Sequence, residues 1–444
     1  MNLTKKLRFL FRFLSAVVKK QYRLVFLGLG LGVLFYFFLP KILLLIPSPQ
    51  KTIKIGMTGQ YTTDTLPQEV LDYISIGLTK ISENGEVSSG LSENWTVSDD
   101  GKIYTFKIGQ NDINWHDNKL FEIKDINYNF KDITSSTTDD DISFSLKEPF
   151  SPFPSVVSRP LFRKGLIGLG DYKINKIIKN GKFVETISLK PYKKSNLPKL
   201  VIKFYKSEMD LKTGFNLGEV NQAGEIFGKD NISLGNSVKI SENILNNVYM
   251  GIFFNTDKIP FSSKSFRQAL AYAIPKETGK NRALGPINPE NWAYNPDVKL
   301  YKQDTVKAKS LLEKEKIDNQ TIIKISTLPQ YQDVAQSISS NWQQIGINSE
   351  VNVISIIPED YDVLLIAREI PKDPDQYYFW HSTQTGNVSN FKSPRIDKLL
   401  EDGRKTVDEE ERKTLYFDFQ RFLVEESPVV FLTHPITYSI IRGQ

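Results

Sequence analysis

The sequence contains no cysteine and only three histidines among its 444 residues. Without cysteine there can be no disulfide, no thiolate metal site, no cysteine nucleophile and no lipid carried on a cysteine. The chain also lacks the HExxH, G-x-S-x-G and Walker A motifs of metalloproteases, α/β-hydrolases and nucleotide-binding proteins. We therefore predict a protein that is not an enzyme, with no cofactor and no metal ligands. A hydrolase assembled from distant residues stays open as an alternative.

Positive and negative charges nearly balance outside the N-terminal segment. The formal charge is +6, but eight of the 57 basic residues lie within residues 1–50, where there is no acidic residue. The rest of the chain contains 49 basic and 51 acidic residues. The bulk of the chain is therefore nearly neutral, which argues against a basic groove for nucleic acid.

The N-terminal segment carries a long apolar run. Leu24–Leu39 has no charged residue, and the run resumes at Ile42–Ile46. At about 1.5 Å per residue this length can cross a bilayer, and seven basic residues precede it. We predict that residues 1–23 are a cytoplasmic basic segment and that residues 24–46 are an uncleaved transmembrane anchor, with the main body extracytoplasmic. A cleaved signal peptide is the alternative, but Pro47-Ser48-Pro49 offers no small-x-small cleavage site.

A chain of this length exceeds one compact core, so two or more domains are expected. In the first half, alternation at Ile53–Met57 predicts a strand and apolar spacing over Leu66–Ile81 predicts a helix. Alternating residues on both sides of Asp100-Gly101 predict a β-hairpin. Thr134–Asp141 is predicted to be a polar loop, followed by a strand at Ile142–Leu146.

The second half is organised around the run Tyr249–Asp257, which predicts a buried strand ending in a turn. A helix is expected next, because Phe266, Leu270 and Ala273 share one face and Pro275 ends the pattern. Further strands and helices follow in alternation, as in α/β proteins. They are expected at Ile322–Thr327, Gln332–Ile345, Asn348–Ile357, Asp362–Ile366, Asp397–Gly403, Glu409–Glu425 and Pro428–Leu432.

Two motifs carry a family resemblance. Asn255-Thr256, Pro260-Phe261 and Arg267–Ile274 resemble the "NT…PF…RQALAYAI" signature of family 5 extracellular solute-binding proteins, the peptide, dipeptide and nickel receptors of ABC importers. Gly90–Ile108 resembles the family's "G…L…W.VS.DG..YTF.L" pattern, and the two motifs stand in family order. The resemblance covers roughly residues 70–440.

The resemblance implies a two-lobed α/β fold like that of type II periplasmic binding proteins, with an extra small domain. On this basis lobe I comprises residues 51–64, 165–250 and 428–444, a small domain trimmed after Asp125 comprises residues 65–164, and lobe II comprises residues 251–427. The chain would cross from one lobe to the other just ahead of Asn255.

Ligand contacts are expected mainly in the segment Arg368–Ser382, where Asp373-Pro374-Asp375 resembles the family's "DPD" element. The resemblance implies an aspartate four positions before Pro374 that pairs with the α-amino group of a peptide, but this chain has Ile370 there. The candidate ligand-binding residues are Glu369, Asp373, Tyr377, Trp380, Asn390 and Asn255. In the alternative interpretation Glu369 faces solvent, Tyr377 and Trp380 pack in the interior, and Asn255 is structural.

We predict a monomeric, membrane-anchored receptor, and the resemblance implies that it binds a short peptide, or a similar polar solute, and passes it to ABC permease subunits. The alternative is a surface receptor for adhesion or signalling that keeps the fold without transport, which the trimmed small domain and Ile370 favour. The sequence leaves open the identity and length of the ligand and whether a metal complex is carried.

Overall fold

The computed structural model describes residues 15, 19–45, 51–109, 113–193, 196–233, 235, 237–276, 279–315 and 321–443. The chain divides into two compact units, one of residues 1–52 with 196–199 and one of residues 53–195 with 200–444. In the first unit the main element is the helix α2 (Tyr22–Leu45). In the part of the chain that the structure describes, no helix is both long and apolar enough to span a bilayer. The transmembrane anchor expected at residues 24–46 is therefore not confirmed.

The second unit, which we call the body, contains a seven-stranded sheet in the order β12-β18-β11-β1-β10-β9-β8. We call this sheet and the helix α5 (Glu208–Asn216) lobe I. The strand β1 pairs in parallel with β11, whereas β18 runs antiparallel to both β11 and β12. The strands are β1 (Thr52–Thr58), β8 (Tyr172–Asn180), β9 (Phe183–Pro191), β10 (Lys199–Tyr205), β11 (Gln222–Ile226), β12 (Val238–Ile244) and β18 (Ile436–Arg442).

A four-stranded antiparallel sheet in the order β4-β5-β7-β6 forms, with the short helix α4 (Phe153–Val156), the small domain. The hairpin expected around Asp100-Gly101 is confirmed, and Gly101 supplies the positive φ of 68° that its turn needs. Phe153 of α4 packs on the rings of the sheet. The strands are β4 (Ser92–Val97), β5 (Ile103–Ile108), β6 (Thr134–Thr137) and β7 (Asp141–Ser145).

Two predictions for the first half of the body are wrong. The helix expected over Leu66–Ile81 is only α3 (Gln68–Ile74), and residues 79–81 form β2 (Thr79–Ile81), paired with β3 (Val87–Ser89). The helix stops because Ser75 is extended and its hydroxyl accepts from the N–H of Leu169 at 3.1 Å, a tertiary contact that local spacing does not reveal. The expected polar loop at Thr134–Asp141 contains β6, whose four residues are all exposed and thus show no apolar alternation.

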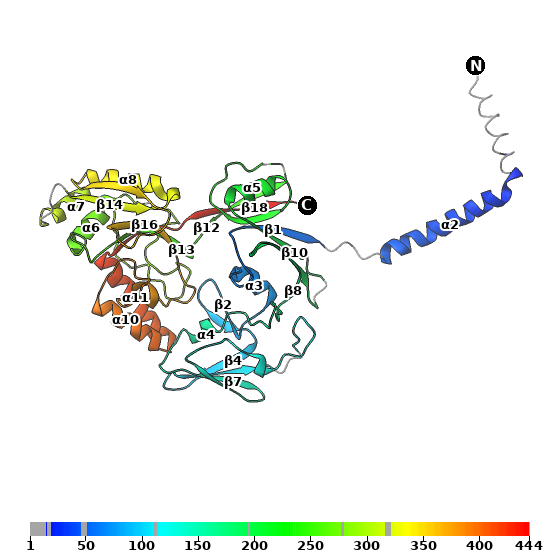
Figure 1. Ribbon diagram of the computed structural model, residues 1–444, viewed down its shortest axis with the longest axis horizontal. Helices are drawn as coiled ribbons and strands as arrows, with labels where there is room; N and C mark the ends of the chain where they lie inside the picture. The colour runs from blue at the N-terminus through cyan, green and yellow to red at the C-terminus, as the bar shows by residue number, and fades with distance from the viewer. Residues whose placement is uncertain are drawn as a thin grey trace, which may run out of the picture. The chain divides into compact units, whose positions relative to one another are not determined.

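A five-stranded sheet in the order β15-β14-β16-β13-β17 and its helices form lobe II (Figure 1). The predicted strand–helix–strand unit is confirmed, with β14 parallel to both β15 and β16. The strands are β13 (Val248–Phe254), β14 (Ile322–Thr327), β15 (Asn348–Val353), β16 (Val363–Glu369) and β17 (Val429–Thr433). The helices are α6 (Lys264–Ala273), α7 (Thr305–Leu312), α8 (Gln332–Gln343), α9 (Tyr377–Trp380), α10 (Pro394–Lys405) and α11 (Glu409–Glu426).

The strand β13 is buried on both faces, as its apolar run predicts. The ring of Phe254 stacks on Phe261 at 5.8 Å and lies near Trp342 of α8. The adjacent Phe253 points to the opposite face, where it stacks on Trp380 of α9 at 6.1 Å. This strand therefore joins the two halves of the core of lobe II.

The chain passes between the lobes at positions that differ from the expected boundaries. The outgoing passage lies between Ile244 of β12 and Val248 of β13, and the returning one between Thr433 of β17 and Ile436 of β18. Residues 429–433 belong to lobe II, although the sequence placed them in lobe I, because β17 pairs with β13. A short apolar run shows that a strand is buried but not which sheet it joins.

Candidate functional site

Near the end of β16, no strand in the described part of the chain pairs with one edge of it, and we call this the open edge. On one side β13 pairs with β16 from Val363 to Glu369, but on the other side β14 pairs only as far as Leu365. The N–H of Ile370 donates to Asn247 on the β13 side. Because backbone groups alternate along a strand, the N–H and C=O groups of Ala367 and Glu369 point to the uncovered side. This open edge offers donors and acceptors for another extended chain.

Acidic side chains from both lobes raise the pKa of one tyrosine, Tyr61, beside this edge. Burial raises the pKa of Tyr61, and the negative charges of Glu225 and then Glu369 raise it further. Tyr61 and Glu225 come from lobe I, whereas Glu369 is the last residue of β16 in lobe II. The two lobes therefore face each other here.

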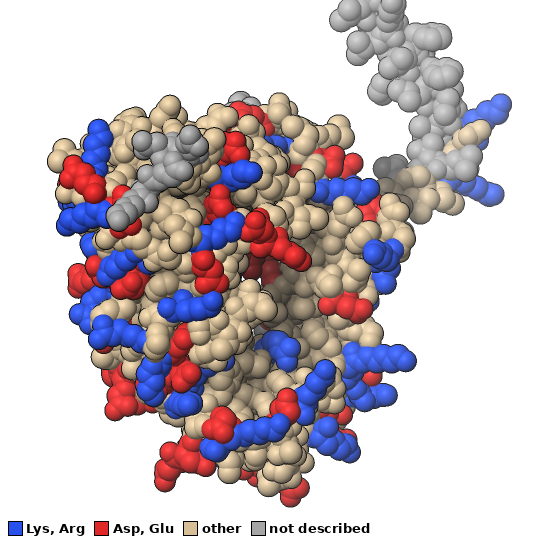
Figure 2. Space-filling model, turned by 60° about the vertical axis from the view of Figure 1, so that its left-hand side comes forward, with Lys and Arg blue, Asp and Glu red and all other residues tan. Residues whose placement is uncertain are grey.

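Two further carboxylates come from α3. Burial, Glu225 and Asp72, in that order, raise the pKa of Glu69. Burial also raises the pKa of Asp72, although its hydrogen bond from Gln68 and the charge of Lys372 oppose the rise. Both side chains are nevertheless exposed to solvent. Side chains that are reached by water yet partly desolvated are expected on the walls of a hollow, and Figure 2 shows a hollow in the body with acidic side chains at its margin.

We call Glu69, Asp72, Glu225 and Glu369 the cleft carboxylates. Glu225 has a positive φ of 54° in a stretch of β11 where the register with β18 shifts between Ala223 and Ile226. A non-glycine residue in this conformation costs about 1–2 kcal/mol. Among the described residues there is no group of three or more histidine, aspartate or glutamate side chains placed to hold a metal ion. The arrangement is suited to attracting positive charge.

The turn between β2 and β3 contacts lobe II close to Asp72, one of the cleft carboxylates. Lys372 Nζ lies 2.7 Å from Glu83, which is in the turn between β2 and β3. Asn291 Nδ2 donates to the carbonyl of Lys372 at 2.8 Å, and the N–H of Trp292 donates to Asn84. These contacts fix the loop that follows β16.

The six residues expected from the sequence are not gathered at one place. Glu369 is exposed at the open edge. Asp373 is bound by Arg412 and Ser155, with only 13% of its side chain exposed. Trp380 is 1% exposed in the core of lobe II, and Tyr377 stacks on His381 at 4.1 Å.

Asn255 and Asn390 contact each other instead of facing the open edge. Asn390 Nδ2 donates to Asn255 Oδ1 at 3.0 Å, and Asn255 Nδ2 donates to the carbonyl of Tyr361 at 2.9 Å. Their role as ligand contacts stays a prediction. Sequence reasoning missed Tyr61, Glu69, Asp72 and Glu225, which no motif marks because they meet only after three separate segments fold together.

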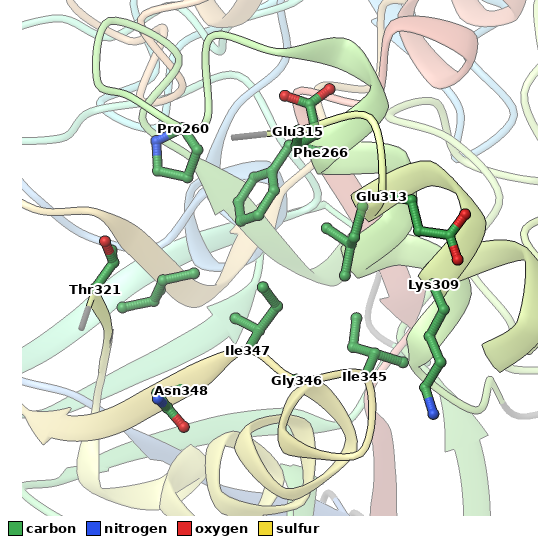
Figure 3. A pocket seen from close by; sticks show the side chains of 12 residues that line it. Pro260, Phe266, Lys309, Glu313, Glu315, Thr321, Ile345, Gly346, Ile347 and Asn348 are labelled. Carbon is green, nitrogen blue, oxygen red and sulfur yellow. The ribbon is translucent and has the colours of Figure 1, made fainter. Parts of the chain in front are cut away.

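A separate cavity of about 350 Å³ lies in lobe II (Figure 3). Its walls include Phe266 of α6, Ile323 of β14 and Ile347, while Glu313 and Lys309 stand at its rim. Two of its lining residues, Glu315 and Thr321, flank residues 316–320 in the sequence, which lie outside the described ranges. We therefore place the candidate site at the open edge of β16.

The chain is similar in sequence to known bacterial binding proteins. The family model described as bacterial extracellular solute-binding proteins, family 5 Middle, matches residues 86–390. The dipeptide-binding protein of Escherichia coli K12 is 22% identical over 459 residues, covering 81% of this chain and 83% of that protein. The di/tripeptide-binding protein 1 of Pseudomonas aeruginosa is 23% identical, covering 86% and 87% of the two chains.

Solved structures show the same architecture. The substrate-binding protein CtaP of Listeria monocytogenes superposes with a TM-score of 0.76 at 19% identity, covering 89% of this chain and 94% of that one. NikZ of Campylobacter jejuni, solved in complex with Ni(L-His), gives 0.72 at 24% identity with the same coverage. These likenesses show an α/β two-domain fold of the periplasmic-binding-protein kind.

Proposed function

Because the chain belongs to the bacterial extracellular solute-binding proteins of family 5, we propose that it binds a short, positively charged peptide between its two lobes and delivers it to the permease of an ABC importer. The observation that carries this proposal is the meeting of an open strand edge with carboxylates of both lobes around Tyr61. The edge suits the peptide backbone, and the carboxylates suit its charge.

The open edge supports a peptide because its contacts do not depend on ligand side chains. An extended ligand beside Ala367 and Glu369 would add a short strand to the sheet, with main-chain hydrogen bonds providing affinity. Each such bond contributes about 0.5–1.5 kcal/mol net. A few of them, with burial of the ligand as the lobes close, can supply the roughly 8 kcal/mol that a micromolar dissociation constant requires.

The cleft carboxylates support a positive charge on the ligand. Asp72 is within reach of Lys372, but that lysine is also paired with Glu83. The negative charge of Glu225 repels that of Glu69 and raises the pKa of Glu69. A ligand ammonium or guanidinium group would relieve this repulsion. The same repulsion would disfavour an anionic ligand.

Attachment to the membrane is part of the proposal, and it rests on the sequence of residues 1–50, which carry eight basic residues and no acidic one. The exposed apolar side chains of α2 support it, since they have no other partner surface in the first unit as described. They include Leu27, Leu31, Val33, Leu34, Phe35, Tyr36, Phe37 and Phe38. Retention of the protein in membranes after alkaline extraction would support this part, and release into the soluble fraction would contradict it.

The ligand proposal is tested by titration calorimetry on the full chain in detergent. We expect the tripeptide Ala-Lys-Ala to bind about tenfold or more tightly than Ala-Ala-Ala, and Ala-Glu-Ala to bind most weakly. The variants E225Q and E369Q should reduce the preference for lysine but leave the binding of Ala-Ala-Ala nearly unchanged. Heat from Ni²⁺–histidine but from no peptide, or equal affinity for the three peptides, would overturn the proposal.

A further inference from the structure

The two passages of the chain between lobe I and lobe II lie side by side and form one ribbon. The N–H of Leu245, in the outgoing passage, donates to the carbonyl of Pro435, in the returning one, at 2.9 Å. On the lobe I side the pairing of β12 with β18 runs up to Ile244 opposite Ile436. Figure 1 shows the returning segment leading from the five-stranded sheet into β18. Any change in the angle between the lobes must bend this ribbon.

His434 stands in the middle of this hinge ribbon and is only 1% exposed. Its Nδ1 lies 2.8 Å from the carbonyl oxygen of Val248, the first residue of β13. A carbonyl oxygen only accepts, so Nδ1 carries the proton and donates. The backbone N–H of His434 donates to Asn281 at 2.6 Å. The residue thus ties the returning passage both to the outgoing one and to the loop at residues 279–283.

The charged groups around His434 are mostly cationic. Arg282 Nη1 donates to the carbonyls of Phe431 and Leu432 in β17, next to the register shift between Met250 and Gly251. Burial lowers the pKa of His434, the hydrogen bond to Val248 opposes this, and the charge of Arg282 lowers it further. Lys276 lies near Arg282. On the outgoing passage, Asn246 donates to Glu290 at 3.0 Å. The bond to Val248 therefore fixes one imidazole proton on Nδ1, and burial and Arg282 disfavour a second proton.

We propose that His434 is a positioning residue of the hinge, which sets the resting angle between lobe I and lobe II and so governs ligand affinity without touching the ligand. The hydrogen bond from His434 to Val248 joins the two passages of the ribbon between the sheets of lobe I and lobe II, and His434 is shielded from water. Loss of the bond would leave the ribbon free to sample more lobe angles. A ligand that binds between the lobes would then have to order a broader ensemble, and its affinity would fall.

The resting angle can be measured without a ligand. The chain has no cysteine, so spin labels can be attached only at K179C on β8 and Q336C on α8, which replace exposed residues of the two lobes. Pulsed electron–electron resonance on the full chain should show a broader distance distribution in H434Q, whose amide does not reach the place of Nδ1. H434N places an amide nitrogen close to that position and should restore the narrow distribution. Equal distributions in all three proteins would overturn the proposal.

A matched control is the substitution H381Q in lobe II. His381 is 5% exposed and bonds to Thr383 and Glu401, away from the hinge ribbon. H381Q should leave the distance distribution unchanged, and broadening equal to that of H434Q would contradict a specific role for His434. Thermal unfolding of each variant shows which of them are folded at the temperature of the measurement.

The link to affinity rests on the proposed function and has its own readout. H434Q should weaken the binding of Ala-Lys-Ala about fivefold or more, whereas H434N should keep it near that of the parent. If the parent protein binds no peptide, the proposed function is refuted, but the effect of H434Q on the distance between the spin labels still tests the hinge. Broadened distances with unchanged affinity would refute the coupling of the hinge to the ligand.

Discussion

Arg412 Nη2 lies 2.7 Å from Asp373 Oδ1, and this ion pair joins α11 to the loop that follows β16. The second carboxylate oxygen of Asp373 accepts from Ser155 Oγ of α4 at 2.9 Å. Burial alone would lower the pKa of Arg412, but the charges of Asp373 and Tyr416 outweigh it and raise that pKa. Asp373 thus connects lobe II to the small domain.

The first prediction concerns this ion pair. D373A should lower the free energy of unfolding by about 3–5 kcal/mol, because it leaves the guanidinium of Arg412 buried without a counter-charge. Chemical denaturation measures the change. The double variant D373A/R412A should cost less than the sum of the two single variants. Unchanged stability with lost peptide affinity would instead assign Asp373 to the ligand.

The second prediction concerns Trp380. W380A should cost about 3–5 kcal/mol, since it removes a buried ring stacked on Phe253. W380F should cost far less and leave peptide affinity unchanged, because the indole Nε1 has no hydrogen-bond partner among the described residues. Denaturation and calorimetry on the same samples test both statements. A large loss of affinity in W380F at unchanged stability would show that Trp380 faces the ligand.

The third prediction is a pH dependence of stability. Burial, and then the charge of Arg282, lower the pKa of Lys276 to about 7. Between that value and the ordinary lysine pKa of about 10.4 the unfolded chain binds more protons, so stability should rise with pH in this window, by up to about 1.4 kcal/mol per pH unit. K276M should flatten this rise. K280M, which removes a neighbouring exposed lysine, is the control, and an equal slope in K276M and the parent would contradict the prediction.

The fourth prediction concerns Glu69. Because its pKa is raised, its charge is lost at a higher pH than that of an ordinary glutamate. The affinity for Ala-Lys-Ala should therefore fall with decreasing pH, and the fall should begin at a higher pH than the ordinary glutamate pKa of about 4.3 would give. E69Q should weaken binding at pH 7 by about two- to fivefold and make it less dependent on pH. Calorimetry at several pH values measures both effects, and a steeper pH dependence in E69Q would refute this role.

Much of the architecture follows from local patterns. The family resemblance carried by Asn255–Ile274 and by the hairpin region is confirmed, and so is the buried strand β13. Apolar periodicity marked these elements because each buries a face or both faces. It failed at β6, which is polar and exposed, and at the end of α3, which depends on the distant Leu169.

The candidate site was harder to predict than the fold. The open edge exists because β14 stops pairing at Leu365, and no sequence pattern gives the relative length of two neighbouring strands. Glu69 and Glu225 lie more than 150 residues apart along the chain, and only the folded body brings them close enough for the charge of Glu225 to raise the pKa of Glu69. The motif Asp373-Pro374-Asp375 lies in the loop that follows β16, but its carboxylates bind Arg412 and Arg404, and its role in ligand binding stays a prediction.

The central claim is that a peptide pairs with the open edge of β16. Hydrogen–deuterium exchange of the full chain, resolved to single amides by mass spectrometry, tests it most directly. The N–H groups of Ala367 and Glu369 should exchange rapidly in the free protein and slow markedly when Ala-Lys-Ala is bound, whereas that of Ile370, already bonded to Asn247, should change little. Bound peptide with unchanged exchange at Ala367 and Glu369 would contradict the account.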